Sequence, residues 1–218
     1  WQDGGGVFQS FAAPISLAEG VHALGYRSQD TVGHREVLRS TTVLVDATTP
    51  QTALVVLGGH QFAGPESATF YASSGTRLGL QAIDPLASGV ASGVELTTYR
   101  DNGIAQTFSG PITLPEGAHA LSYQSQDRVA NLEILRSTNV WIDAMPPVTT
   151  WHIGSPWYVG ADGTNYITPA TTVTLTAADP ALPTGQPGSG VRQIEVAIDG
   201  GPFQTHAAPL TFAEGRHT

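Results

Sequence analysis

The chain has 218 residues, a net charge of −9, and neither cysteine nor lysine. These features exclude disulfides, thiolate metal sites and lysine chemistry, and an acidic surface without a basic patch argues against nucleic acid and anionic membranes as partners. The hydrophobic content of 40% with 25 Gly and 15 Pro is typical of a turn-rich globular chain, and no apolar run approaches the roughly 18 residues of a membrane span.

A repeated stretch organises the chain from its first half onward. EGVHALGYRSQD (Glu19–Asp30) returns as EGAHALSYQSQD (Glu116–Asp127), and EGRHT begins the stretch again at Glu214. From Glu19 to Asp46 and from Glu116 to Asp143, 17 of 28 positions are identical. The stretch recurs after 97 and then 98 residues, and a repeat with this period predicts a tandem array of similar domains.

The repeat predicts three domains. Residues 1–47 are the C-terminal half of one repeat, 48–145 a complete repeat, and 146–218 the N-terminal three-quarters of a third. Pro50, Pro146 and Pro147 restrict the linkers and keep them extended. We expect the chain to be part of a longer array of repeats. There are two alternative explanations for its incomplete outer repeats: proteolysis, and strand exchange between copies that builds a filament.

The predicted elements are strands and tight turns, in chain order. Period-two alternation in Thr76–Ile83, His119–Ser125 and Thr172–Ala178 predicts half-buried strands, and no stretch has the period of a helix. The Asn-Gly and Gly-Gly pairs within Asp101–Gly103 and Asp199–Gly201 predict hairpin turns. The predicted core includes Leu80, Leu121 and Tyr123.

About seven short strands per repeat predict an all-β fold of tandem immunoglobulin-like antiparallel β-sandwiches in a linear array. The pattern A-x-D…S-G-V, a hairpin turn, E-G-x-H-x-L-x-Y-x-S-x-D…E and V-D-x-x-x-P-x-T resembles the immunoglobulin-like tandem repeats of bacterial secreted and cell-surface proteins, over the whole chain. The resemblance implies an extracellular or cell-surface location. One departure is that such repeats usually carry Gly-Asn where this chain has Gly33-His34 and Ala130-Asn131.

Recurring aspartates are the first candidate site. In an immunoglobulin-like topology the linker, the B–C loop and the F–G loop meet at one end of the domain, so Asp46, Asp84 and Asp127 are expected to converge. Asp143 and Asp179 are their equivalents at the next junction. Carboxylates gathered in this way predict a Ca²⁺ site between domains. The alternative is that each aspartate only caps a turn through its own backbone.

An aromatic cluster is the second candidate. Trp151, Trp157 and Tyr158, with Tyr166 nearby, lie in the third repeat and have few counterparts in the second. Exposed rings of this kind predict a platform for carbohydrate, whereas core or inter-domain packing is the alternative.

A recurring histidine, at His22, His119 and His217, is expected to be a partly buried, hydrogen-bonded structural residue. No nucleophile pattern accompanies it, and one glutamate per repeat cannot pair with another inside a cleft, so no enzyme activity is predicted.

Two functions follow as hypotheses. The first is a stalk, fibre or adhesin arm of a larger secreted or surface-anchored bacterial protein, whose partners are neighbouring repeats, other copies in a filament, and cell-surface polysaccharide. The second is a carbohydrate-binding or spacer module of a secreted hydrolase.

Overall fold

The computed structural model describes all residues from Trp1 to Thr218 and contains eighteen strands in six sheets and no helix. The all-β class predicted from the sequence is therefore confirmed. No helix is available that would be long and apolar enough to cross a membrane. The chain divides into two compact units, here described separately. Unit one comprises Trp1–Gly58, Thr76–Thr113 and Ala120–Thr138, and unit two Gly59–Gly75, Leu114–His119 and Asn139–Thr218.

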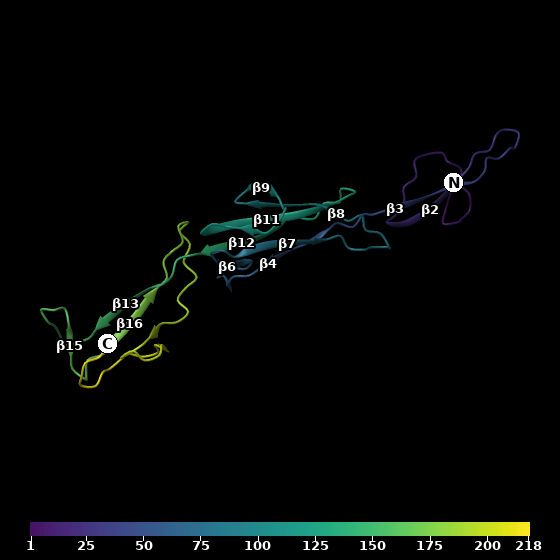
Figure 1. Ribbon diagram of the computed structural model, residues 1–218. Helices are drawn as coiled ribbons and strands as arrows, with labels where there is room; N and C mark the ends of the chain where they lie inside the picture. The colour runs from purple at the N-terminus through teal and green to yellow at the C-terminus, as the bar shows by residue number, and fades with distance from the viewer. The chain divides into compact units, whose positions relative to one another are not determined.

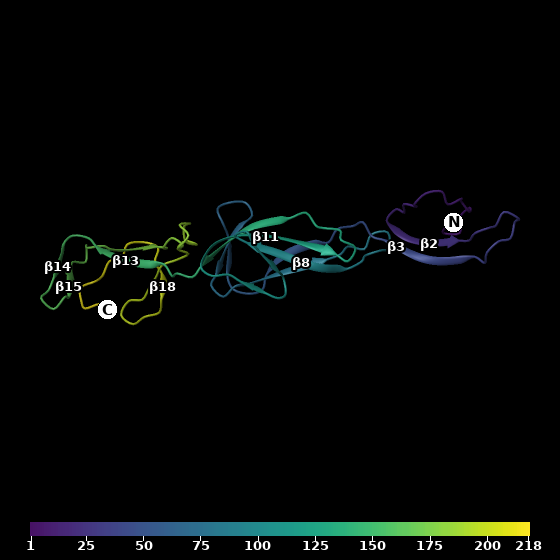
Figure 2. The ribbon, with the colours of Figure 1, turned by 90° about the horizontal axis from the view of Figure 1, so that it is seen from above.

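The first sheet of unit one contains residues 19–46, which we call the first copy of the repeated stretch; residues 116–143 are the second copy. The sheet has the order β1-β2-β3 and consists of β1 (Gln2–Asp3), β2 (Gly20–Tyr26) and β3 (Arg39–Val45). Strands β2 and β3 lie side by side and pair antiparallel from Gly20↔Val45 to Tyr26↔Arg39 (Figure 2). No strand pairs with the outer edge of β3.

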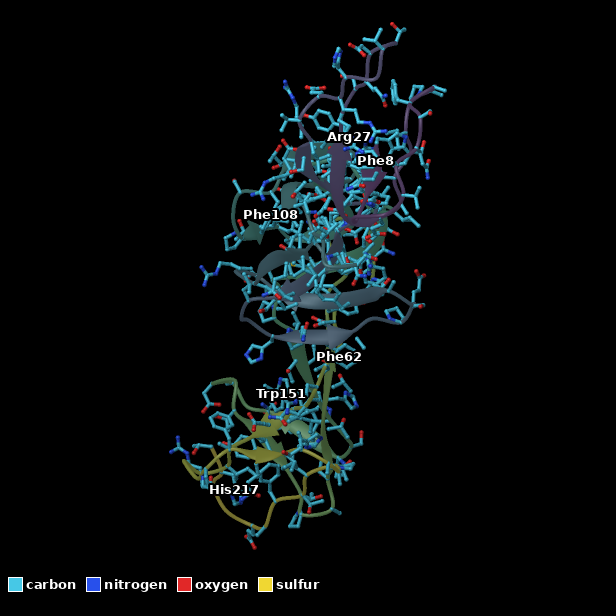
Figure 3. All side chains as sticks on the ribbon, turned by 90° about the vertical axis from the view of Figure 1, so that its right-hand side faces the viewer. Phe8, Arg27, Phe62, Phe108, Trp151 and His217 are labelled. Carbon is cyan, nitrogen blue, oxygen red and sulfur yellow. The ribbon has the colours of Figure 1, made fainter.

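The long loop before β2 is held to this sheet by an aromatic contact. The Arg27 guanidinium lies 4.3 Å from the centroid of the Phe8 ring (Figure 3). A cation over an aromatic face is attracted by the ring quadrupole. The contact fastens an otherwise irregular segment to the end of β2.

The second sheet of unit one has the order β10-β7-β4 and consists of β4 (Gln51–Val56), β7 (Arg77–Ile83) and β10 (Ile112–Thr113). Strands β4 and β7 run side by side in Figure 1, paired antiparallel from Gln51↔Ile83 to Val56↔Leu78. The alternating side chains of β7 bury Leu78 and Leu80, which are 1% and 7% exposed, and Ile112 of β10 is buried with them. These residues supply the apolar face that the alternation predicted.

The hairpin of unit one joins β8 (Val94–Asp101) and β9 (Ile104–Thr107), and β8 also pairs with β11 (Gly117–Asp127). Asn102 and Gly103 form the turn with φ values of 48° and 85°. Two consecutive positive φ values match the twist of a tight hairpin, and Asn-Gly tolerates them best. The predicted turn at Asp101–Gly103 is therefore confirmed.

Unit two contains β5 (Gln61–Ala63), β6 (Thr69–Ser73) and most of β12 (Arg136–Asp143). With the strands above, these complete a six-stranded sheet of order β5-β6-β12-β11-β8-β9. The β6–β12 pair is parallel, from Asn139↔Thr69 to Asp143↔Ser73, so the expectation of purely antiparallel sheets is wrong at this pair. Parallel neighbours need a long connection, and here more than sixty residues separate the two strands in sequence.

Three short antiparallel pairs complete unit two. They are β13 (Val148–Ile153) with β16 (Val173–Ala178), β14 (Trp157–Val159) with β15 (Asn165–Ile167), and β17 (Glu195–Val196) with β18 (Gln204–Thr205). Each of the six sheets draws its strands from only one of the three predicted repeats.

The predicted core is right at two positions of three. Leu80 and Leu121 are 7% and 2% exposed, whereas Tyr123 is only partly buried. Tyr123 pairs with Tyr99 across the β8–β11 ladder, and both line an open cavity of about 270 Å³ with Gln106 and Leu135. A large ring with a polar hydroxyl is stable at such a position, where one end remains wet.

Candidate functional site

Three aspartates from three different elements of unit one meet at one end of its sheets. Asp46 directly follows β3, Asp84 directly follows β7, and Asp127 ends β11. One carboxylate oxygen of each lies within 4.8 Å of those of the other two, and Asp127 is 0% exposed. The structure thus brings together the three aspartates that the topology argument placed at this junction.

Asp46 and Asp84 are held by consecutive backbone amides of one loop. The Ser92 N–H donates to Asp46 Oδ2 and the Gly93 N–H donates to Asp84 Oδ2, each at 2.6 Å. Gly93 has a φ of 87°, a conformation that strains side-chain-bearing residues, and a Cβ there would lie 2.6 Å from Arg128 Nη1. The Ser-Gly of the repeat motif is therefore the element that grips the two carboxylates.

Asp127 caps the loop that follows it. Its Oδ1 accepts the N–H groups of Val129 and Asn131 at 3.0 and 2.8 Å, and its Oδ2 accepts the Asn131 side-chain amide at 2.7 Å. The same amide nitrogen donates to the Asp46 backbone carbonyl at 3.0 Å. Asn131 therefore fastens the loop after β11 to the Asp46 backbone, a role that the sequence argument missed although it had noted the Ala130-Asn131 pair.

These hydrogen bonds fit the turn-capping interpretation, but they leave one carboxylate oxygen of the cluster without a hydrogen-bond partner. Asp84 Oδ1 is buried and accepts no hydrogen bond. Hydrogen bonding from Ser92 is the main cause that holds the pKa of Asp46 below its ordinary value, so this carboxylate is ionised at neutral pH. Neighbouring carboxylates repel one another, and a hard cation with oxygen ligands relieves that repulsion.

The second junction repeats the first with the same atoms. In unit two the Ser189 N–H donates to Asp143 Oδ2 at 2.7 Å and the Gly190 N–H donates to Asp179 Oδ2 at 2.6 Å. The Asp–Ser pair spans 46 residues at both junctions. Burial raises the pKa of Asp143, but the hydrogen bonds that it accepts, chiefly from Ser189 and also from the Met145 amide, together outweigh burial and leave the pKa lowered. Asp179 Oδ1 is buried without a partner, as Asp84 Oδ1 is.

The predicted carbohydrate residues are exposed but do not share one face. Trp151 on β13, labelled in Figure 3, is 59% exposed, and Trp157 and Tyr158 on β14 are 50% and 68% exposed. Neighbouring residues of a strand point to opposite faces, so Trp157 and Tyr158 diverge. The structure instead pairs Tyr158 with Tyr166 across the β14–β15 ladder, with ring centroids 6.1 Å apart.

The recurring histidines make one bond in common. The Nε2 atoms of His22, His119 and His217 lie 2.8 to 3.1 Å from the carbonyl oxygen of the residue four positions earlier. In addition, His22 Nδ1 lies 2.6 Å from Asp3 Oδ2, and His217 Nδ1 lies 2.8 Å from Asp199 Oδ2. The protonated form of each of these two rings donates from both nitrogens, one to the carbonyl and one to the carboxylate.

No protein-family model matches the chain, and no curated protein is significantly similar to it.

Proposed function

We propose that the chain is a non-catalytic structural segment of a larger secreted or surface-anchored bacterial protein, in which tandem immunoglobulin-like repeats form a stalk, fibre or adhesin arm. The observation that carries the proposal is the recurrence of one bonded linker. At both junctions the last aspartate of a repeat accepts a hydrogen bond from a serine amide 46 residues later, in the B–C loop of the next repeat. A linker that is bonded in the same way each time sets a constant attachment between successive repeats, as a spacer requires.

The sheets of residues 48–145 support the immunoglobulin-like part of this proposal. This stretch contains β4 to β12, and they form two sheets. About one hundred residues with seven to nine short strands in two sheets is the size of an immunoglobulin domain. The parallel β6–β12 pair joins β5 and β6 to the second sheet, whose β11–β8 and β8–β9 pairs are antiparallel.

Ca²⁺ is the cofactor that we propose for the junctions. Asp46, Asp84 and Asp127 offer three carboxylates at the first junction, and Asp143 and Asp179 offer two at the second. Ca²⁺ is bound by six to eight oxygens, so backbone carbonyls and water would complete the set. The buried, unbonded Asp84 Oδ1 is the observation that favours a bound cation over turn capping alone.

The location and size of the native protein test the structural proposal. Antibodies raised against this chain should label intact source cells or the culture medium. On a denaturing gel they should detect a polypeptide far heavier than 22.8 kDa, the mass of this chain. An intracellular band close to that mass would overturn the proposal.

A carbohydrate-binding or spacer module of a secreted hydrolase is the second candidate, favoured by the exposed Tyr158–Tyr166 pair. Pull-down with insoluble cell-wall polysaccharide tests it, with Tyr158→Ala as the variant and Tyr26→Ala, an exposed tyrosine of the first repeat, as the matched control. Binding to the polysaccharide that is lost in Tyr158→Ala and kept in Tyr26→Ala would favour this candidate.

A further inference from the structure

An open cavity of about 270 Å³ lies on the complete repeat, over three neighbouring strands. Strands β9, β8 and β11 lie side by side there (Figure 1), and three successive residues of each line the cavity. All lining residues lie between Thr98 and Leu135, inside the complete repeat and inside unit one. Because ligand pockets are usually roughly 300–1,000 Å³, this volume suits a small ligand or one unit of a longer chain.

Two rows of mostly polar side chains cross the three strands at this cavity. In the order β9, β8, β11, the rows are Ala105–Arg100–Ser122 and Thr107–Thr98–Gln124. Residues two apart on a strand point to the same face, so the two rows gather three hydroxyls, one amide and one guanidinium on one face of the sheet. Leu135 adds an apolar side chain that is 50% exposed.

The only charged residue in the lining is a cation, although the chain has 18 acidic and 9 basic residues. This residue, Arg100, is exposed, and its guanidinium forms no hydrogen bond, ion pair or ring contact with the rest of the chain. A guanidinium presents its N–H donors in a planar fork that matches the two oxygens of a carboxylate. The charge of the lining therefore favours a ligand that carries a carboxylate.

The fold of the repeat does not require these side chains. The third repeat carries Ala197 and Glu195 at the positions of Arg100 and Thr98, 97 residues later. The hairpin turn that follows is present in both repeats. The cationic, hydroxyl-rich lining is thus a feature of the complete repeat that the third repeat does not share.

We propose that this cavity binds a carboxylate-bearing sugar unit of an acidic polysaccharide. Arg100 donates two parallel N–H···O bonds to the sugar carboxylate. The hydroxyls and the amide of the two rows both donate and accept, as the hydroxyl groups of a sugar ring do, and Leu135 packs against the carbon face of the ring. A neutral sugar lacks the partner of the guanidinium, and an acidic peptide lacks the ring of hydroxyls. The site lies apart from Tyr158 and Tyr166, goes beyond the spacer role and does not depend on it.

Titration of the full 218-residue chain with the trisaccharide of galacturonic acid, followed by backbone amide chemical shifts, tests the proposal. We expect saturable shifts concentrated at residues 98–107 and 122–124, with a dissociation constant of about 1 mM or below. The neutral trisaccharide of galactose and the peptide tri-glutamate are the matched probes. Each should bind about tenfold more weakly or not at all, because each loses one of the two sets of hydrogen bonds.

Two variants locate the bound sugar. Arg100→Ala should weaken binding by about tenfold, because the charge-assisted bonds to the carboxylate are lost, and the alanine at position 197 shows that the repeat accommodates this change. Arg77→Ala, which removes an exposed arginine of the same repeat outside the cavity, should leave the affinity unchanged. Ala105→Trp should abolish binding by filling the cavity without a change of charge.

Three outcomes would each overturn the proposal. The first is the absence of saturable shifts at about 10 mM of the acidic trisaccharide. The second is an equal affinity for the galactose trisaccharide or for tri-glutamate. The third is an affinity for the acidic trisaccharide that neither Arg100→Ala nor Ala105→Trp changes.

Discussion

The two copies of the repeated sequence keep the same local hydrogen bonds in different surroundings. Asp30 caps the backbone amides of the second and fourth residues after it, and Asp127 does the same. His34 takes the place of Asn131 on the other carboxylate oxygen. These short-range bonds form wherever the sequence occurs.

Burial separates the copies. The Asp127 and Ser125 side chains are 0% exposed, while their counterparts Asp30 and Ser28 lie at the surface. The comparison teaches that the repeat sequence sets its own turns and ladder, whereas strands from elsewhere in the repeat determine what it buries. The leucine and glutamate variants substitute equivalent positions in the two copies, so one serves as the control for the other.

The largest expected difference is at the buried leucine. Leu121→Ala should lower the free energy of unfolding by about 2–4 kcal/mol, because it leaves a cavity in a packed interior. Leu24→Ala should cost less than half as much, since Leu24 is only partly buried. Urea denaturation followed by tryptophan fluorescence measures both. Equal losses would mean that the first copy has a core of its own.

The second largest difference in stability is expected between variants of the glutamates Glu133 and Glu36. Glu133→Gln should cost about 2 kcal/mol, because it disturbs bonds to the buried Thr52 and Ser125. Glu36→Gln should leave the denaturation midpoint almost unchanged. Similar denaturation midpoints for the two variants would contradict a stabilising role for the hydrogen bonds from Thr52 to Glu133.

The parent and Glu133→Gln should also differ in how their stability depends on pH. Burial raises the pKa of Glu133, but the bonds from Thr52, Arg136 and Ser125 outweigh it, and the pKa is lowered from 4.5. The stabilisation is therefore complete above pH 4.5 and is lost as the pH falls through the lower folded-state value. The stability of Glu133→Gln should decline less steeply than that of the parent over that window.

The repeat, the strands and the hairpin could be predicted because their signals are local. Alternation marks β7, and Asn102-Gly103 marks the turn, within a few residues each. The convergence of Asp46, Asp84 and Asp127 could also be predicted, because the immunoglobulin-like topology that the resemblance implies places their loops at one end. Whether they bind a cation stays a prediction.

The remaining features depend on distant partners that no local pattern encodes. The parallel β6–β12 pair joins residues about seventy positions apart. Tyr123 follows the alternation of Leu121 but faces an open cavity because of its neighbours on β8 and β9. The bond from Asn131 to the Asp46 carbonyl joins residues 85 apart. Such contacts follow from the packing of whole strands.

The aspartate junctions give the third difference. If Ca²⁺ binds at Asp46, Asp84 and Asp127, millimolar Ca²⁺ should raise the melting temperature by a few degrees and chelator should reverse the rise, because a ligand at tenfold its dissociation constant contributes about 1.4 kcal/mol. Asp84→Asn should abolish the response, and Asp179→Asn, at the junction with two carboxylates, should largely preserve it. If Ca²⁺ leaves the melting temperature of the parent unchanged, and Asp84→Asn is more stable than the parent in chelator, the carboxylates only repel one another.

The smallest expected effect concerns the histidine of the first copy. The hydrogen bond to Asp3 is the main cause that raises the pKa of His22 above 6.5, with help from the Ala18 carbonyl, and Asp199 acts likewise on His217. Because the folded-state pKa is raised, the stabilisation is complete below pH 6.5 and is lost as the pH rises through the folded-state value.

Ring-nitrogen chemical shifts measured between pH 5 and 9 should therefore place the His22 midpoint above 6.5. Asp3→Asn should move this midpoint down, because a neutral amide no longer favours the imidazolium, and should leave His217 unchanged. Asp199→Asn should do the reverse, which makes each variant the control for the other. A His22 midpoint that stays in place in Asp3→Asn would show that the Ala18 carbonyl alone holds the proton, and the paired carboxylate would then serve only to orient the ring.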